Sequence, residues 1–367
     1  MGRFPDAWLQ ELLSKSDLAA IASEYTVLKP KGRRLWGCCP FHSEKTPSFS
    51  VTPDTQLYYC FGCHAGGGVI QFVMQAERLT YTEAVKSLAQ RAGMELPEEV
   101  NDENLQRERA QKERLYSACR EAARYYVRNL LGEQGEAARQ YLIRRGINAS
   151  AVKAFGLGYA LPGWENLAQY MEQKGVSPET LVEAGLAIRG KQGRIYDAYR
   201  DRIIFPIISA NGRVLGFGAR TMGDDTPKYL NTGDTPIFNK RYNLYGLNLQ
   251  RGKRPGDLIM VEGYMDVVRL YEGGVTNAVA SLGTALTVQQ ARLLKRYVPR
   301  VYICYDGDAA GQNATLRGMD ILAGEGLEVR VMAIPGGQDP DEYVGAHGGE
   351  GFLSLKDQAK NLQEYKL

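Results

Sequence analysis

Two short pairs of metal-ligating side chains lie near the start of this sequence. Cys39 and His42 are separated by two residues, and after 17 intervening residues (43–59) Cys60 and Cys63 repeat the same spacing. Each pair places two ligands across one tight turn, and two such turns complete the tetrahedral ligand set that structural zinc prefers. The segment between the pairs is rich in β-forming residues. The sequence therefore predicts a zinc ribbon that holds one structural zinc ion.

Two neighbouring residues offer alternative ligands for this site. Cys38 in place of Cys39 would lengthen the spacing to His42, so we prefer Cys39, and we interpret His64 as a bystander. Six cysteines in 367 residues are too few for a disulfide framework and are typical of a metal site with spare thiols. Cys304 lies inside an apolar run and is predicted to be a buried strand thiol.

The last third of the chain has the pattern of a parallel sheet. Residues 258–261, 278–281, 301–305 and 328–334 are short apolar runs separated by helical segments. In such sheets the carboxyl ends of the strands lie along one edge, where ligands bind. Side chains that follow these strands are therefore expected to lie close together.

Acidic residues follow three of these strands. They are Glu262, Asp306, Asp308, Asp339 and Asp341. Mg²⁺ takes hard oxygen ligands of this kind, and a metal pair is a standard arrangement for phosphoryl and nucleotidyl transfer. One such turn would be explained by the preference of turns for Asp. Three in succession favour a metal site.

Charge is divided unevenly along the chain. Residues 101–256 carry 25 basic and 16 acidic side chains, a net charge of +9, whereas residues 257–367 carry 10 and 15, a net charge of −5. A basic block beside an acidic one suggests a surface for a phosphate backbone next to a site for divalent cations. A solvated face would give the same count, so the motifs must decide.

Composition also bounds the location of the protein. No apolar run approaches the roughly 18 residues needed to span a bilayer, and the first residues lack a signal-peptide pattern. We therefore expect a cytoplasmic protein with no membrane partner.

Cations and aromatic residues are interleaved around the two ligand pairs. Together they would suit single-stranded nucleic acid, because bases stack on aromatic rings and phosphates are neutralised. A ribbon this small also needs aromatic side chains for its core, and we favour that interpretation for most of the rings. The residues are Lys29, Lys31, Arg33, Arg34, Trp36, Lys45, Phe49, Tyr58 and Tyr59.

At these residues the chain resembles the bacterial, DnaG-type DNA primase family. Residues 39–49 and 60–63 are similar to the two knuckles of its zinc-binding domain, and residues 262–266 and 306–308 to the TOPRIM module. Primases share that module with type IA and type II topoisomerases and some nucleases. Residues 202–247 resemble the primase-specific part of the polymerase domain, which separates the primases from the other classes.

The resemblance has two departures. His64 and Gly68 stand where the family usually has Gly and Asp, which affects local contacts rather than zinc binding. The chain also ends at Leu367, whereas the family continues into a helicase-binding domain. We therefore expect a C-terminally truncated chain, with a replicative helicase as a partner only through the domain that is absent.

The expected fold class is α+β and multidomain, with a zinc ribbon followed by a mixed α/β polymerase domain that contains a Rossmann-like parallel TOPRIM sheet. The expected parts are a zinc-binding domain (1–96), a linker (97–103), the basic N-terminal part of the RNA polymerase domain (104–256), the TOPRIM module (257–345) and the start of a helical C-terminal part (346–367).

The resemblance implies a DNA primase, which synthesises short RNA primers de novo from ribonucleoside triphosphates on single-stranded DNA. Two or more Mg²⁺ or Mn²⁺ ions would be held by Asp306 and Asp308, with Asp339 and Asp341 at further metal positions. Glu262 would be either a metal ligand or the base that receives the 3′-hydroxyl proton. The basic positions that match the family's template groove are Arg145, Arg220, Lys228 and Lys240.

The residues alone do not exclude two other classes of protein. A TOPRIM nuclease or topoisomerase would need Mg²⁺ but no ribonucleotides, and a topoisomerase would also need a nucleophilic tyrosine. A zinc-dependent DNA-binding module without catalysis would tolerate the replacement of Glu262 by glutamine.

Overall fold

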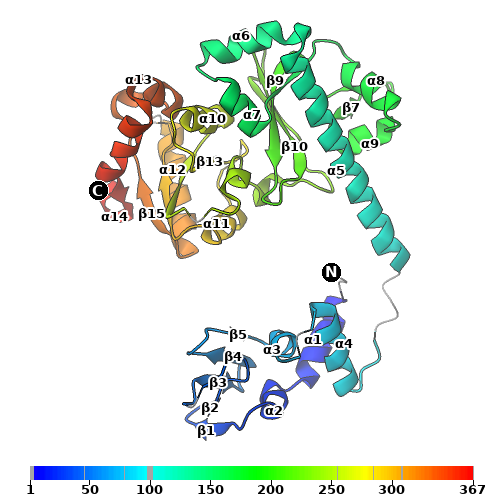
Figure 1. The fold of residues 1–367 in the computed structure, drawn as a ribbon, viewed down its shortest axis with the longest axis vertical. Helices are drawn as coiled ribbons and strands as arrows, with labels where there is room; N and C mark the ends of the chain where they lie inside the picture. The colour runs from blue at the N-terminus through cyan, green and yellow to red at the C-terminus, as the bar shows by residue number, and fades with distance from the viewer. Residues whose placement is uncertain are drawn as a thin grey trace. The chain divides into compact units, whose positions relative to one another are not determined.

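The computed structural model of this chain describes residues 4–44, 46–77, 79–96, 102–253, 255–283, 285–306 and 309–366. The chain divides into two compact units, Met1–Arg109 and Ala110–Leu367 (Figure 1). The predicted fold class is confirmed, because an antiparallel ribbon precedes a mixed α/β region with a parallel sheet. Most of the expected linker, residues 97–101, lies outside the described residues.

The first unit is a small antiparallel sheet with helices before and after it. Its elements are α1 (Asp6–Lys15), α2 (Leu18–Ser23), β1 (Lys29–Lys31), β2 (Arg34–Gly37), β3 (Phe49–Thr52), β4 (Leu57–Cys60), β5 (Gly66–Gly67), α3 (Val69–Ala76) and α4 (Tyr81–Arg91). The five strands pair in sequence order. Phe49, Tyr58 and Phe72 are buried together in the core, which holds the ribbon against α3.

Local sequence signals explain where this unit's elements begin. The backbone N–H of Thr80 donates to the Glu83 carboxylate over 2.8 Å, and the Thr80 hydroxyl accepts from the Glu83 N–H. This capping box begins α4 where the spacing of the two residues predicts a helix start. The short edge strands β1 and β5 were not predicted, because two or three residues give no readable alternation.

The second unit begins with an antiparallel sheet between helices. Its elements are α5 (Asp102–Leu131, which starts in the first unit), α6 (Glu136–Arg144), α7 (Ala149–Phe155), β6 (Gly158–Ala160), α8 (Asn166–Gln173), α9 (Pro178–Glu183), β7 (Ala187–Arg189), β8 (Ile195–Asp197), β9 (Arg202–Ile208), β10 (Val214–Thr221) and β11 (Tyr229–Asn231). The main strands follow the order β11-β10-β9-β6. Ile204 packs toward α5, whereas Phe205 packs toward α7, so the sheet lies between these helices (Figure 1).

A second, mostly parallel sheet completes this unit. Its elements are β12 (Asp257–Val261), α10 (Tyr264–Glu272), β13 (Ala278–Ala280), α11 (Val288–Lys295), β14 (Arg300–Ile303), α12 (Ala309–Gly324), β15 (Glu328–Val331), α13 (Pro340–Ser354), β16 (Lys360–Asn361) and α14 (Leu362–Lys366). The strand order is β13-β12-β14-β15-β16, and only β16 runs antiparallel. The sheet therefore extends past residue 345.

Alternation along β12 shows how this sheet is covered. Leu258 and Met260 pack in the cluster that contains α11 and α12, and Ile259 and Val261 pack in the cluster that contains α10 and α13. Both faces are therefore covered by helices, which explains why β12 is an unbroken apolar run. Within the described ranges, no helix has the length and apolar character needed to cross a membrane.

Candidate functional site

The first unit brings the four predicted zinc ligands together. One donor atom from each of Cys39, His42, Cys60 and Cys63 lies within 4.8 Å of all the others. Thiolates about 2.3 Å from a tetrahedral zinc ion lie about 3.8 Å apart, and the Sγ atoms of Cys39 and Cys63 are 3.8 Å apart. The donor set and its spacing therefore fit zinc. Cys38 does not belong to this group.

A carboxylate orients the histidine of this group. Glu44 Oε2 lies 3.2 Å from His42 Nε2, while His42 Nδ1 lies 3.8 Å from the Cys60 sulfur. A carboxylate beside one ring nitrogen favours the proton on that nitrogen and leaves the other nitrogen for the metal. Glu44 also accepts from the backbone N–H of Cys39 over 2.6 Å. The sequence analysis missed Glu44, although it follows His42 by only two residues.

Hydrogen bonds favour a thiolate at Cys60. Burial opposes its ionisation, but the Ser48 hydroxyl and the backbone N–H groups of Cys63 and Gly62 approach the sulfur and lower the pKa of Cys60 to about 7. Burial raises the pKa of the Cys39 thiol to about 12. Zinc binding requires deprotonated thiols and stabilises them, so metal binding at this group is expected to release protons.

In the second unit, a cavity of about 300 Å³ lies at the carboxyl edge of the parallel sheet. Its acidic lining residues follow β12, β14 and β15, as parallel strands require. They are Glu262, Asp266, Asp306, Asp339 and Asp341. Asp308, a predicted ligand, lies outside the described residues. Within the described ranges, these carboxylates do not form as tight a donor group as the Cys/His residues.

A direct contact ties the ends of β12 and β14 together. Glu262 Oε1 accepts from the backbone N–H of Asp306 over 3.1 Å. A Cβ atom on Gly311 would lie 2.1 Å from the Asp306 carbonyl oxygen and 3.0 Å from Glu262 Oε1. Glycine at this position therefore permits the close approach of α12 to both acidic residues.

Asp266 is a pocket carboxylate that the sequence analysis quoted but did not assign. Burial, reinforced by the charges of Asp306, Asp339 and Asp341, raises its pKa to about 8 against a hydrogen bond from the Gly263 N–H. Carboxylates crowded in this way repel one another unless a cation compensates them. Crowded carboxylate oxygens of this kind are suitable ligands for a hard divalent cation.

Asp339 and Asp341 reach the pocket from the start of α13. Asp339 caps that helix by accepting from the backbone N–H of Glu342 over 2.7 Å. Asp341 Oδ1 accepts from Arg269 Nε over 2.7 Å, and both side chains are largely shielded from solvent. One oxygen of Asp341 is therefore already paired with the positively charged side chain of Arg269.

Three of the four predicted basic residues line the same pocket as the carboxylates. Arg145 and Lys228 are exposed, and Arg220 is buried. Arg220 Nη1 donates to the Tyr229 hydroxyl over 3.0 Å, and its buried Nε has no hydrogen-bond partner in the described part of the chain. Lys240 is not among the lining residues.

The ribbon carries a second group of candidate residues on its surface. Trp36 and Phe61 are stacked with ring centroids 5.7 Å apart, and Tyr59 meets Phe61 edge-on at 5.0 Å. Phe61 is 52% exposed and Tyr59 is 40% exposed. Lys31 lies 5.7 Å from the Trp36 ring. The aromatic residues of the ribbon are therefore divided between core and surface, and Phe61 was missed by the sequence analysis.

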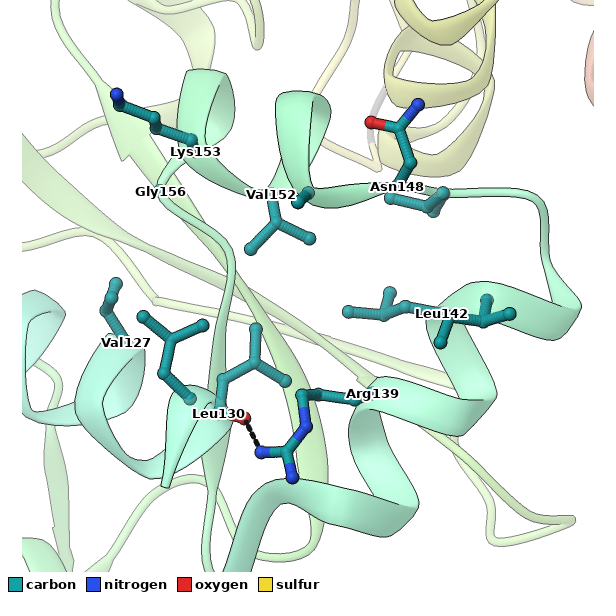
Figure 2. A pocket seen from close by; sticks show the side chains of 12 residues that line it. Val127, Leu130, Arg139, Leu142, Asn148, Val152, Lys153 and Gly156 are labelled. Carbon is teal, nitrogen blue, oxygen red and sulfur yellow. Dashed lines mark hydrogen bonds between the residues drawn. The ribbon is translucent and has the colours of Figure 1, made fainter. Parts of the chain in front are cut away.

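Another cavity, of about 490 Å³, lies between α5, α6 and α7 (Figure 2). Its lining is mostly aliphatic, and Leu142 and Val152 point into it (Figure 2). Arg139 donates to the carbonyl oxygen of Leu130 over 2.6 Å. No carboxylate, thiol or imidazole is among its lining residues in the described part of the chain. The cavity is therefore lined by no side chain of the usual metal-ligating types in the described part of the chain.

Three family models match the chain in succession. Residues 4–104 match the CHC2 zinc finger, residues 125–251 the N-terminal domain of the DNA primase catalytic core, and residues 259–344 a Toprim-like module. The zinc-finger match agrees with the Cys/His group, and the Toprim-like match covers the strands whose ends carry the carboxylates.

Curated relatives agree with these matches. The DNA primase of Clostridium acetobutylicum is 46% identical over 98% of this chain, and that of Halalkalibacterium halodurans is 44% identical over 100%. The chain spans about 60% of the length of these relatives.

Two solved structures cover different shares of the chain. The zinc-binding and RNA polymerase domains of Aquifex aeolicus primase match with a TM-score of 0.64 and 36% identity, covering 96% of this chain and 85% of that one. A DnaG primase catalytic domain bound to single-stranded DNA matches with a TM-score of 0.66 and 39% identity, covering 70% of this chain and 84% of that one. From its zinc ribbon to its Toprim-like sheet, this chain belongs to the DnaG-type family of bacterial DNA primases.

Proposed function

We propose that this chain synthesises short RNA primers on single-stranded DNA, as a nucleotidyltransferase that uses ribonucleoside triphosphates. One observation carries the proposal: a single cavity is lined by five carboxylates on the Toprim-like sheet and three cations from the preceding segment. Nucleotidyl transfer needs both kinds of side chain. Carboxylates hold the divalent metal ions, and positively charged side chains hold the triphosphate of the nucleotide.

The carboxylates are the proposed ligands of two or more Mg²⁺ or Mn²⁺ ions. Asp306, Asp339 and Asp341 would hold them with Asp308, while crowded Asp266 would lose its proton when a cation arrives. Bound cations would supply Lewis-acid activation of the 3′-hydroxyl and neutralise the leaving pyrophosphate. Glu262 uses Oε1 to hold the Asp306 backbone. Its other oxygen would either bind a metal or receive the hydroxyl proton.

The cations of the pocket are proposed to hold phosphates. Arg220 is suited to this role because its guanidinium is buried, is fixed by Tyr229 and retains a donor without a partner in the described residues. Arg145 and Lys228 are exposed and would meet the template backbone or the incoming triphosphate. Lys240 would contact template outside this pocket.

Replacing Lys228 by glutamine is expected to weaken single-stranded DNA binding and to flatten its salt dependence. Each lost phosphate contact reduces the slope of log K against log salt by about 0.7 for single strands. Fluorescence anisotropy across a salt series measures this slope. Lys191→Gln, an exposed lysine of the same basic block that does not line the pocket, is the matched control. If both variants keep the wild-type slope, Lys228 does not contact phosphate.

The zinc ribbon is proposed to contact the template through its exposed aromatic residues. Replacing Phe61 by alanine removes a ring on which a base would stack, which is worth about 1–3 kcal/mol per base and so roughly tenfold in affinity. The change is measured as the dissociation constant for an unlabelled oligonucleotide in a competition assay. Leu57→Ala removes an exposed apolar side chain from the same segment and should leave affinity unchanged. Equal effects in both variants would assign Phe61 a structural role.

The proposal is tested by incubating the zinc-loaded chain with single-stranded DNA, four ribonucleotides and Mg²⁺. Expected products are RNA dinucleotides and longer oligomers whose sequence is complementary to the template. A Toprim nuclease would instead shorten the template without ribonucleotides, and a topoisomerase would form a covalent tyrosine adduct with DNA. If the chain makes no RNA but still binds DNA, it is a DNA-binding module without catalytic activity.

A further inference from the structure

Arg269 joins two segments that line the carboxylate pocket. It lies in α10, and its Nε donates to Asp341 Oδ1 over 2.7 Å. Its Nη1 donates to the carbonyl oxygen of Gly146, which is more than a hundred residues away in sequence. The ion pair is largely shielded, with the two side chains 15% and 14% exposed. The Nε and Nη1 groups of Arg269 therefore both donate to partners within the protein.

Two glycines leave the space that this guanidinium occupies. Gly146 has a φ of +67°, and a Cβ atom there would lie 2.2 Å from Arg269 Nη1. A Cβ atom on Gly345, in α13, would lie 2.9 Å from Nη2. The two hydrogen bonds of the guanidinium fix it in the space that these glycines leave open.

The same helix holds the α6–α7 connection at a second point. Glu272 Oε1 accepts from the backbone N–H groups of Ala151 over 3.0 Å and Asn148 over 3.3 Å. Arg145, which lines the pocket, immediately precedes Gly146 in this connection. Since α10 also carries Asp266, one helix sets the positions of two carboxylates and one cation around the pocket.

We propose that Arg269 is a positioning residue that fixes the Asp341 carboxylate for metal binding and couples it to the turn that carries Arg145. This inference rests on the proposed function of the pocket. Arg269 is not itself a pocket-lining residue, and it acts through the side chain of Asp341 and the backbone of Gly146.

The test measures binding of Mn²⁺ by calorimetry to the full, zinc-loaded chain in the absence of nucleotide. Replacement of groups that orient a metal ligand typically costs 10–100-fold in metal affinity. Arg269→Gln is therefore expected to weaken Mn²⁺ binding by about tenfold, and Asp341→Asn by at least as much. The double variant should be no weaker than Asp341→Asn alone, because the two residues act as one unit. Arg292→Gln, which removes an exposed ion pair on α11, is the matched control and should leave affinity unchanged.

Two results would overturn the inference while the proposed function stands. They are a folded Arg269→Gln chain with unchanged or tighter Mn²⁺ binding, and additive losses in the double variant. If Asp306→Asn also leaves Mn²⁺ binding unchanged, the pocket is not the metal site and the proposed function fails instead. Thermal unfolding of each variant distinguishes a local change from loss of the fold.

Discussion

Replacing Cys60 by serine, or removing zinc with a chelator, is expected to unfold the first unit while the second unit stays folded. Cys60 is fully buried and packs in the same core cluster as Phe49 and Tyr58. Structural zinc contributes about 10–16 kcal/mol in small zinc domains, whereas a whole domain is stable by only about 5–15 kcal/mol. Loss of the metal therefore exceeds what the small core can replace. The measurement is limited proteolysis of residues 1–109 together with the zinc content.

Cys38→Ser is the matched control for this experiment. Cys38 neighbours a ligand in sequence but is not one of the four grouped donors. It should keep one zinc per chain and resist proteolysis as the wild type does. Protection of residues 1–109 in the zinc-free Cys60→Ser chain would contradict the structural role of the metal.

Replacing Glu262 by glutamine is expected to reduce primer synthesis by on the order of 10²-fold or more, the usual cost of one electrostatic contact made at the reacting centre. The change removes one negative charge at the end of β12 and weakens the acceptor for the Asp306 N–H. Volume is nearly unchanged, so the fold should be kept. Initial rates of dinucleotide formation on single-stranded template measure the effect, with DNA affinity measured in parallel.

Glu328→Gln supplies the comparison for Glu262→Gln. Glu328 lies in β15 of the same sheet, is 45% exposed at its side chain and pairs with Arg300 and Arg330 on the surface. Exposed ion pairs of this kind contribute about 0–1 kcal/mol, so the rate of primer synthesis should stay near that of the wild type. A full rate in the Glu262→Gln chain would show that the pocket does not perform the chemistry.

The strands that carry the carboxylates were predictable because each is a short apolar run ending in acidic residues. β12 and β14 lie within a residue or two of the predicted positions, and the shared edge follows from parallel pairing. The zinc ligands were equally readable, since paired spacing and ligand chemistry are local properties of the sequence.

Contacts between distant segments were not predictable in the same way. Nothing in the sequence links Arg269 to Gly146 and Asp341, because both contacts depend on how separate elements pack. The basic residues illustrate the same limit. Arg145, Arg220 and Lys228 converge on one pocket and Lys240 does not, although all four have the same character in the sequence. The antiparallel sheet of β6, β9, β10 and β11 was also not delineated, since its glycines interrupt the alternation.

Divalent cations are proposed to bind among the carboxylates at the edge of the Toprim-like sheet. Iron-mediated hydroxyl-radical cleavage tests this directly, with Fe²⁺ in place of Mg²⁺ and the cut sites mapped by mass spectrometry. We expect cuts clustered near Glu262, Asp306 and Asp339 that excess Mg²⁺ suppresses and that Asp306→Asn reduces. Cuts elsewhere that Mg²⁺ suppresses equally well, with none at these strand ends, would contradict it.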